Sequence, residues 1–186
     1  MHDEGGRNTP RFAGRKAHMK RSLYIPKRYK ITIPFVGEVE FQPNDQERQA
    51  AWNLYVELQT RIAVQPFRPD SGLLREVLSS LYSLFAFTRE VLRQAGPDVA
   101  RTPESFGPLA IEVLTVGIAP FTTKWHQRLL QHELHRPEGV TPFEHERQWS
   151  EFEAMVAELE VLQSEVKQYA DALLRIAGLS SAKEAE

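Results

Sequence analysis

The sequence predicts a mainly α-helical fold, an antiparallel four-helix bundle with an N-terminal β-hairpin and a flexible basic arm. Three observations support this prediction: four long segments carry apolar residues at spacings of three and four, one short segment alternates apolar and polar residues, and basic residues concentrate before residue 31. The 186 residues fit one domain of about 100 to 200 residues. We therefore expect a basic arm at 1–22, a single domain at 23–178 with the hairpin at 29–42, and a frayed tail at 179–186.

The N-terminal arm carries much of the positive charge. Residues 1–30 contain nine Lys or Arg against two acids, a net charge of +7, so the remainder carries −9 although the whole chain carries −2. Such an arm either binds nucleic-acid phosphates, or is a solubilising tail or one docked on the protein's own acidic surface. The candidate nucleic-acid-binding residues are Arg7, Arg11, Arg15, Lys16, Lys20, Arg21, Lys27 and Arg28.

Residues 29–42, YKITIPFVGEVEFQ, alternate apolar and polar side chains on either side of a turn at 34–37. A period of two is typical of β-strands. Because a lone two-stranded ribbon is marginal in water, its apolar side must lie on the helices or join the sheet of another chain. In the second case the hairpin is an interface.

The first helix is predicted from Asn44 to about Val64, because Asn44 and Glu47 form a variant of the capping box. Its buried face is predicted to contain Trp52, Tyr55, Leu58 and Ile62.

The second helix is expected to begin at a cap formed by Asp70 or Ser71 and to reach Gln94. Gly96 and Pro97 should end it there. Its apolar residues form a wide face.

The third helix is predicted to start at Thr102 and Pro103, since proline suits the first helical position. Residues 109–118 are apolar on nearly all sides, which is typical of the centre of a bundle. Pro120 should kink or split the helix before it continues to His135.

The fourth helix has the clearest pattern. Thr141 and Glu144 predict a capped start, and Gly178 predicts a left-handed terminator. Apolar residues follow three-four spacing throughout, so we expect one continuous helix of about 36 residues, roughly 54 Å long.

Histidines cluster between residues 126 and 145, and this cluster is the only constellation suited to a metal. The spacing of HELH differs from the HExxH of zinc peptidases, where the two imidazoles lie four residues apart. The alternative is that these histidines are packed, solvated or hydrogen-bonded near a helix junction. The candidate metal ligands are His126, His132, His135, Glu144 and His145.

Two other groups have open interpretations. Glu112 is either a functional carboxylate or an edge residue paired with Arg89 or Arg93. The three tryptophans either form an aromatic pocket or are ordinary core and rim residues: Trp52, Trp125 and Trp149.

Composition excludes several classes of protein. The absence of cysteine excludes disulfides, thiolate catalysis and sulfur-ligated metals, and agrees with a cytoplasmic location. The first residues lack the apolar core of a signal peptide, and the apolar run 106–121 is too short for a membrane span. No nucleotide-binding or nucleophile motif is present, so we predict no catalytic residue and no cofactor.

Three stretches, AWNLYVELQTRIAVQPF, LLREVLSSLYSLFAFTREVL and KWHQRLL, resemble uncharacterised bacterial helical proteins, some associated with phage-defence loci. The resemblance covers residues 29–177 and implies a regulatory or assembly role beside a separate effector. It implies no activity and no site residue.

We therefore predict a non-enzymatic helical module that binds a protein partner, or itself, through the hairpin edge or the helices. Two alternatives remain open. One is a nucleic-acid-associated subunit that uses the basic arm, and the other is a metal-dependent enzyme at the histidine cluster 126–145.

Overall fold

The computed structural model describes residues 28–179, and over that range it is mainly helical with one two-stranded sheet. The predicted arm at 1–22 and the predicted tail, apart from Leu179, lie outside the described residues. The elements in chain order are strands β1 (Tyr29–Ile33) and β2 (Gly37–Phe41), helix α1 (Asp45–Thr60), the 3-10 turn η1 (Ile62–Val64), helix α2 (Leu74–Ala95), the 3-10 turn η2 (Pro97–Ala100), helix α3 (Phe106–Glu112), the π-helical segment η3 (Val113–Ile118), and helices α4 (Ala119–Glu133), α5 (Pro142–Arg147) and α6 (Phe152–Ile176).

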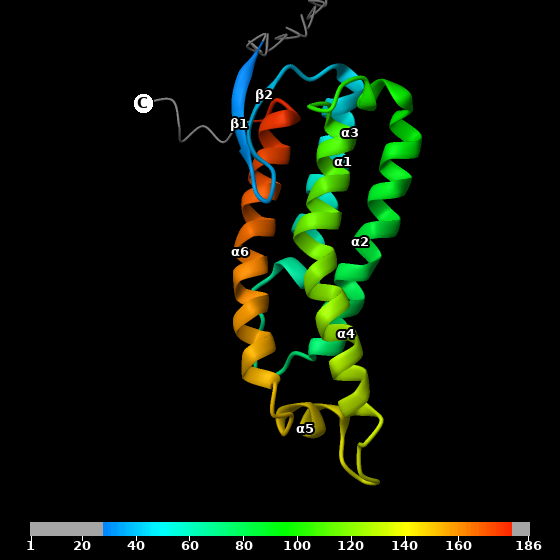
Figure 1. Ribbon diagram of the computed structural model, residues 1–186, viewed down its shortest axis with the longest axis vertical. Coiled ribbons are helices and arrows are strands. Elements are labelled where there is room, and N and C mark those ends of the chain that lie inside the picture. Colours follow the sequence, from blue (N-terminus) through cyan, green and yellow to red (C-terminus); the bar gives the residue numbers. More distant parts are fainter. Residues whose placement is uncertain (1–27, 180–186) are drawn as a thin grey trace, which may run out of the picture.

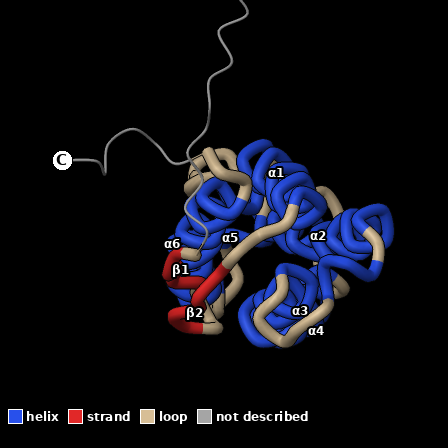
Figure 2. Tube along the Cα trace, turned by 90° about the horizontal axis from the view of Figure 1, so that it is seen from above, coloured by secondary structure: helices blue, strands red, loops and turns tan. Residues whose placement is uncertain are grey.

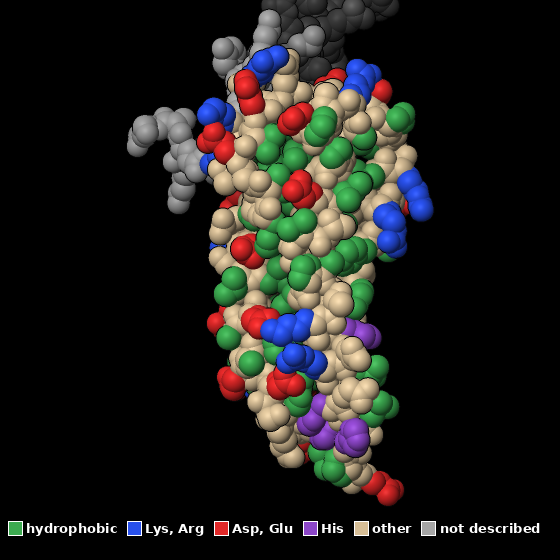
Figure 3. Space-filling model, viewed as in Figure 1, with side chains coloured by type: hydrophobic (Ala, Val, Ile, Leu, Met, Phe, Trp, Pro, Cys, Tyr) green, Lys and Arg blue, Asp and Glu red, His purple; other side chains and the backbone are tan. Residues whose placement is uncertain are grey.

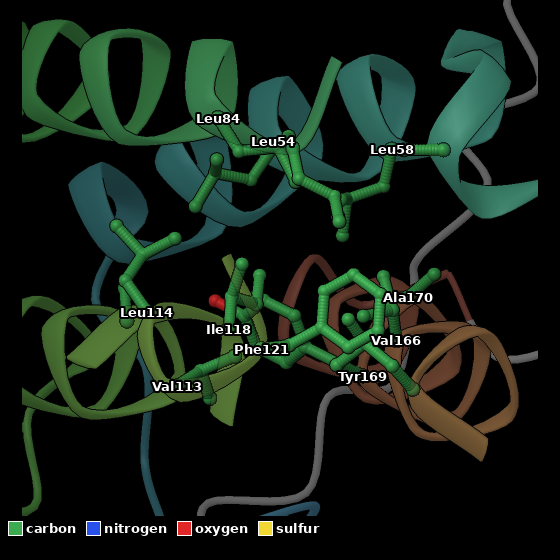
Figure 4. Packing of buried hydrophobic residues seen from close by; sticks show 14 of the residues in the cluster. Leu54, Leu58, Leu84, Val113, Leu114, Ile118, Phe121, Val166, Tyr169 and Ala170 are labelled. Carbon is green, nitrogen blue, oxygen red and sulfur yellow. The ribbon is translucent and has the colours of Figure 1, made fainter. Parts of the chain in front are cut away.

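The long helices follow one common axis (Figure 1). Helix α1 packs most extensively on α6 and also on α2, while α4 contacts both α2 and α6. Seen from above, the hairpin lies at one edge, beside α6 (Figure 2). Figure 4 shows side chains of α1 and α2 meeting those of η3, α4 and α6 in one apolar core, among them Leu54, Leu84, Ile118, Phe121, Val166 and Tyr169.

The hairpin forms as predicted, with β1 and β2 antiparallel and Ile31 opposite Val39. Ile31, Ile33, Val39 and Phe41 are buried, and β1 packs on α6. On the other side of the ribbon, Lys30 and Glu38 form an exposed ion pair at 2.7 Å. The apolar side of the ribbon therefore rests on the helices, which is one of the two arrangements that its marginal stability requires.

Helix α1 begins at the predicted capping box of Asn44 and Glu47. The α-helix ends at Thr60, so the predicted turn up to Val64 is 3-10 instead. The predicted buried face is wrong at Trp52 and Ile62, which are 39% and 61% exposed. The buried apolar residues of α1 are Ala50, Ala51, Leu54 and Leu58, and the helix packs on α6 and α2.

Helix α2 is capped from a distant part of the chain. The prediction of a cap at Asp70 or Ser71 is wrong, because the N-cap residue is Leu73, which has no side-chain acceptor. Instead, the Glu146 carboxylate accepts hydrogen bonds from the first two helical amides, at 2.7 and 3.3 Å. The orphan donors of a buried helix end are thereby satisfied.

The third helix begins at Phe106, not at Thr102 and Pro103 as predicted. The Phe106 amide donates to the buried carboxylate of Glu47, at 3.0 Å, so this start also depends on another helix. Pro120 does not split the helix, which runs unbroken from 106 to 133. The π-helical segment η3 immediately before Pro120 supplies the local widening that a proline ring needs within a helix.

Residues 109–118 do not lie at the centre of the molecule as predicted. One side of this segment is buried, but Ile111, Glu112 and Val116 face solvent. Among residues 28–179, Glu112 has no ion-pair partner, so the predicted pairing with Arg89 or Arg93 is not found. The segment therefore has one buried side and one exposed side, although its residues are apolar on almost every side.

The predicted fourth helix is two helices, because α5 ends at Arg147 and α6 begins at Phe152. The capping box of Thr141 and Glu144 is confirmed as the start of α5. Between the helices, Trp149 is buried against Trp125 with ring centroids 5.8 Å apart. The chain turns between the two helices to allow this packing. No glycine or proline at this point of the sequence indicates the turn.

Two predicted glycine terminators are confirmed. Gly96 after α2 and Gly178 after α6 have φ angles of +77° and +78°, which glycine adopts without a Cβ penalty. At the second, the amides of Gly178 and Leu179 bond back to Arg175 and Leu174 in the Schellman pattern.

Candidate interaction surfaces

The tip of the hairpin contacts the π-helical segment. Phe35 has a φ of +70°, which makes it the one non-glycine residue with positive φ among residues 28–179. Its ring lies against Gly117 of η3, where a Cβ would come within 2.5 Å of the ring. A strained turn and a π-helical segment, both features that concentrate at functional sites, therefore meet at one contact.

The third helix also exposes apolar side chains. Ile111 is 51% exposed and Val116 is 54% exposed, and on the neighbouring helix α6 Val161 is 61% exposed. Figure 3 shows apolar side chains gathered over the middle of the face that α3, α4 and α6 present in Figure 1. We call Ile111, Val116 and Val161 the apolar face.

A shallow groove of about 500 Å³ runs between the two helices that carry the apolar face. Gly117, Pro120 and Phe121 form one wall, and the other wall includes Val161 and Leu162. The lining also includes the charged residues Lys124, Glu158 and Glu165. The Lys124 ammonium bonds to Glu158, which lowers the pKa of the Glu158 carboxyl. Large exposed apolar patches rimmed by polar residues are typical of protein-binding sites.

A second groove, of about 750 Å³, follows the free edge of β2. Residues 38–42 form one wall, and the start of α1 and residues 98–105 form the other. Its acidic residues are Glu38, Glu40, Glu47, Asp98 and Glu104, and its basic residues are Arg28 and Arg101.

Two of the predicted metal ligands meet. His132 on α4 and His145 on α5 stack with ring centroids 3.8 Å apart and planes 6° apart. Each Nε2 lies 2.8 Å from the backbone carbonyl of the other histidine. Because a carbonyl only accepts, both Nε2 atoms carry hydrogen and donate, so neither offers its lone pair to a metal.

The other three predicted ligands are engaged separately. His126 Nδ1 lies 3.2 Å from the Arg75 guanidinium and must accept from it. His135 Nδ1 bonds the Gln131 carbonyl, and Glu144 belongs to the α5 capping box, whose hydrogen bonds lower its pKa. Within residues 28–179, no group of three or more His, Asp or Glu side chains is placed to hold a metal ion.

The carboxylate of Glu146 lies in the same region, where α5 meets the start of α2. Burial raises its pKa above the ordinary value, while hydrogen bonds from the α2 amides oppose that shift. Nearby, Arg75 holds Glu133 through two hydrogen bonds, at 2.8 and 2.6 Å. The histidines and acids of this region therefore fasten α5 to α2 and α4.

Of the predicted nucleic-acid-binding residues, only Arg28 is among the described residues, and the other seven lie outside them. Its exposed guanidinium lies 3.9 Å from Glu40. Of the tryptophans, Trp125 and Trp149 belong to the core, whereas Trp52 is on the rim and stacks on Tyr55. The sequence did not identify Phe35, Val116 or Val161, although Phe35 in a turn was a visible signal.

No protein-family model, curated protein or solved structure matches this chain. One described helix, 106–133, is long and apolar enough by length and composition to cross a membrane, and half of its most apolar window is buried in the fold. The core helix of a soluble protein meets the same criteria. The predicted absence of a membrane span stays a prediction.

Proposed function

We propose that this chain is a non-enzymatic interaction module, an antiparallel four-helix bundle that binds a protein partner or a second copy of itself through the apolar face. One observation carries the proposal: the most apolar helix leaves Ile111 and Val116 half exposed, and the groove between it and α6 is lined mostly by apolar residues. Burial of this surface would contribute about 25 cal/mol for each Å² of apolar area removed from water.

The hairpin and the histidine region support a structural role for the rest of the fold. The hairpin tip is seated on Gly117, and the paired histidines join α4 to α5. Both contacts keep the helices that carry the apolar face in place. In the cytoplasm of a bacterium, such a module would suit the regulatory or assembly role in antiviral defence that the resemblance implies.

Site-specific photo-crosslinking tests the proposal. A photoreactive residue placed at Val116 should yield one dominant adduct in the native host, of defined mass, with a partner or with a second copy. The same residue at Gln127, which is exposed on α4, serves as the control. The proposal is overturned if Val116 gives no adduct, or if both positions give the same mixture of adducts.

A further inference from the structure

The groove beside β2 follows an open strand edge. Strand β1 pairs with one edge of β2, and no third strand pairs with the other edge anywhere in residues 28–179. Residues 38–42, which contain most of β2, form a wall of this groove of about 750 Å³. Among residues 28–179, no backbone hydrogen bond joins the free edge of β2 to another segment, and the residues of the strand line the groove.

An open strand edge that lines a groove suits an extended peptide. Such a peptide adds a strand through backbone hydrogen bonds, and the side chains around it determine the sequence it accepts. The five residues of β2 offer an edge of roughly 17 Å at about 3.4 Å per residue. The opposite wall, at residues 98–105, lies within the same groove and would flank the added strand.

The charge of the groove selects a basic peptide. Glu38 and Asp98 already pair with Lys30 and Arg101, at 2.7 and 2.9 Å. Glu40 lies only 3.9 Å from Arg28, with both side chains exposed. Glu104 makes no ion pair with any residue from 28 to 179. Glu40, whose ion pair with Arg28 is long and exposed, and the unpaired Glu104 are therefore the carboxylates on opposite walls that lysines or arginines of an occupant would contact.

The N-terminal segment of this chain has the required chemistry and begins at the groove. Residues 1–27 contain seven Lys or Arg against two acids. The described chain starts at Arg28, which itself lines the groove. Twenty-seven residues can span as much as about 90 Å when extended, so the segment is long enough to reach any point along β2.

We propose that part of residues 1–27 docks in this groove as an extended strand on the free edge of β2, with its basic side chains against Glu40 and Glu104. Docking would occupy the same lysines and arginines that could otherwise bind a nucleic acid. The inference does not rest on the proposed function, because the apolar face belongs to α3, η3 and α6, and the groove belongs to β2 and residues 98–105.

Amide hydrogen exchange on the full-length protein tests the docking. The β2 amides that do not bond to β1 should exchange at least about tenfold more slowly in the wild type than in variants that cannot dock the arm. One variant reverses charge on the arm, Arg15→Glu with Lys16→Glu. A second reverses it in the groove, Glu40→Lys with Glu104→Lys. The matched control is Glu153→Lys, an exposed acid on α6 away from the groove.

The expected result is slow exchange in the wild type and the control, fast exchange in each charge-reversed variant, and slow exchange again when both reversals are combined. Equally fast exchange of these amides in the wild type and all variants would overturn the proposal. So would protection that increases with protein concentration, because the occupant would then be the arm of a second copy. Protection that appears only after an oligonucleotide is added would also overturn it, since the arm would not be docked beforehand.

Discussion

At the scale of single residues, Phe35 combines an unfavourable backbone with a specific contact. A positive φ costs a residue with a Cβ about 1–2 kcal/mol, and the Phe35 ring recovers part of that cost by packing on Gly117. We expect Gly117→Ala to lower the free energy of unfolding by about 1–3 kcal/mol, because the added Cβ would lie against the ring. Urea denaturation measures the change.

The control for this contact is Phe35→Ala. Once the ring is absent, Gly117→Ala should cost much less, so the double-mutant cycle should give a coupling of more than about 0.5 kcal/mol. Additive effects of the two substitutions would show that the hairpin tip does not rest on the π-helical segment.

Tyr169 has a buried hydroxyl with no hydrogen-bond partner in residues 28–179. Burial raises the pKa of this phenol, so it stays neutral. An unsatisfied buried hydroxyl is costly, and we expect Tyr169→Phe to stabilise the fold by about 1 kcal/mol in thermal or urea denaturation. The control is Tyr82→Phe, which removes a hydroxyl that donates to the Thr122 carbonyl and should bring no gain. Destabilisation by Tyr169→Phe would contradict this account.

Glu146 is the acceptor for the first amides of α2. Glu146→Ala should lower the free energy of unfolding by about 1–2 kcal/mol, because those buried donors lose their partner. The matched control, Glu153→Ala on the exposed side of α6, should stay within about 0.5 kcal/mol of the wild type. Equal effects of the two substitutions would contradict the role of Glu146 as the cap of α2.

The raised pKa of Glu146 also predicts a pH dependence. Because the folded state binds this proton more tightly than the unfolded state, the contribution to stability is fully present below the ordinary value of 4.5. It is lost as the pH rises through the folded-state pKa. The stability of the wild type relative to Glu146→Gln should therefore fall over that window in denaturation curves recorded at several pH values. A rise over the same window would show that the ionised form is favoured instead.

At the scale of elements, the stacked histidines join α4 to α5. His132→Ala and His145→Ala should each destabilise the protein by about 1–2 kcal/mol, since each removes one side of a pair of reciprocal hydrogen bonds. Together they should cost clearly less than their sum in a double-mutant cycle. His135→Ala is the control, because the His135 ring, in the turn after α4, bonds the carbonyl of Gln131 only four residues earlier. Additive losses would indicate two independent contacts.

Features that depend on neighbouring residues could be predicted from the sequence. Alternation at 29–42 gave the hairpin, and the side chains of Asn44 and Thr141 gave two capping boxes. Features that depend on distant residues could not be predicted. The cap of α2 comes from Glu146, 72 residues away from Leu74, and the turn between α5 and α6 depends on where Trp149 packs.

The candidate sites follow the same division. Clustering of histidines in the sequence correctly indicated that His132 and His145 are close, but the direction of their hydrogen bonds depends on the path of the backbone. The apolar sequence at 109–118 predicted burial on all sides. Which side is exposed depends on which neighbouring helices pack against the segment. The exposure of Val116 could therefore not be predicted from the sequence.

At the scale of the whole molecule, the apolar face and the β2 groove are separate surfaces. The apolar face uses α3, η3 and α6, while the groove uses β2, the start of α1 and the loop before α3. A partner on the apolar face and the basic arm in the groove can therefore be tested one at a time. Charge reversal in the arm should leave partner binding through Val116 unchanged.

Sedimentation velocity of the protein purified from its native host, as wild type and as Val116→Glu, tests the central claim most directly. We expect the wild type to sediment as a stoichiometric complex, with a partner or a second copy, and the Val116→Glu variant to bind at least about tenfold more weakly, since a charge would be buried in an apolar contact. Thr123→Glu, an exposed substitution on α4, should behave as the wild type. A wild type that sediments as a free monomer, or a Val116→Glu variant that keeps its full complex, would contradict the account.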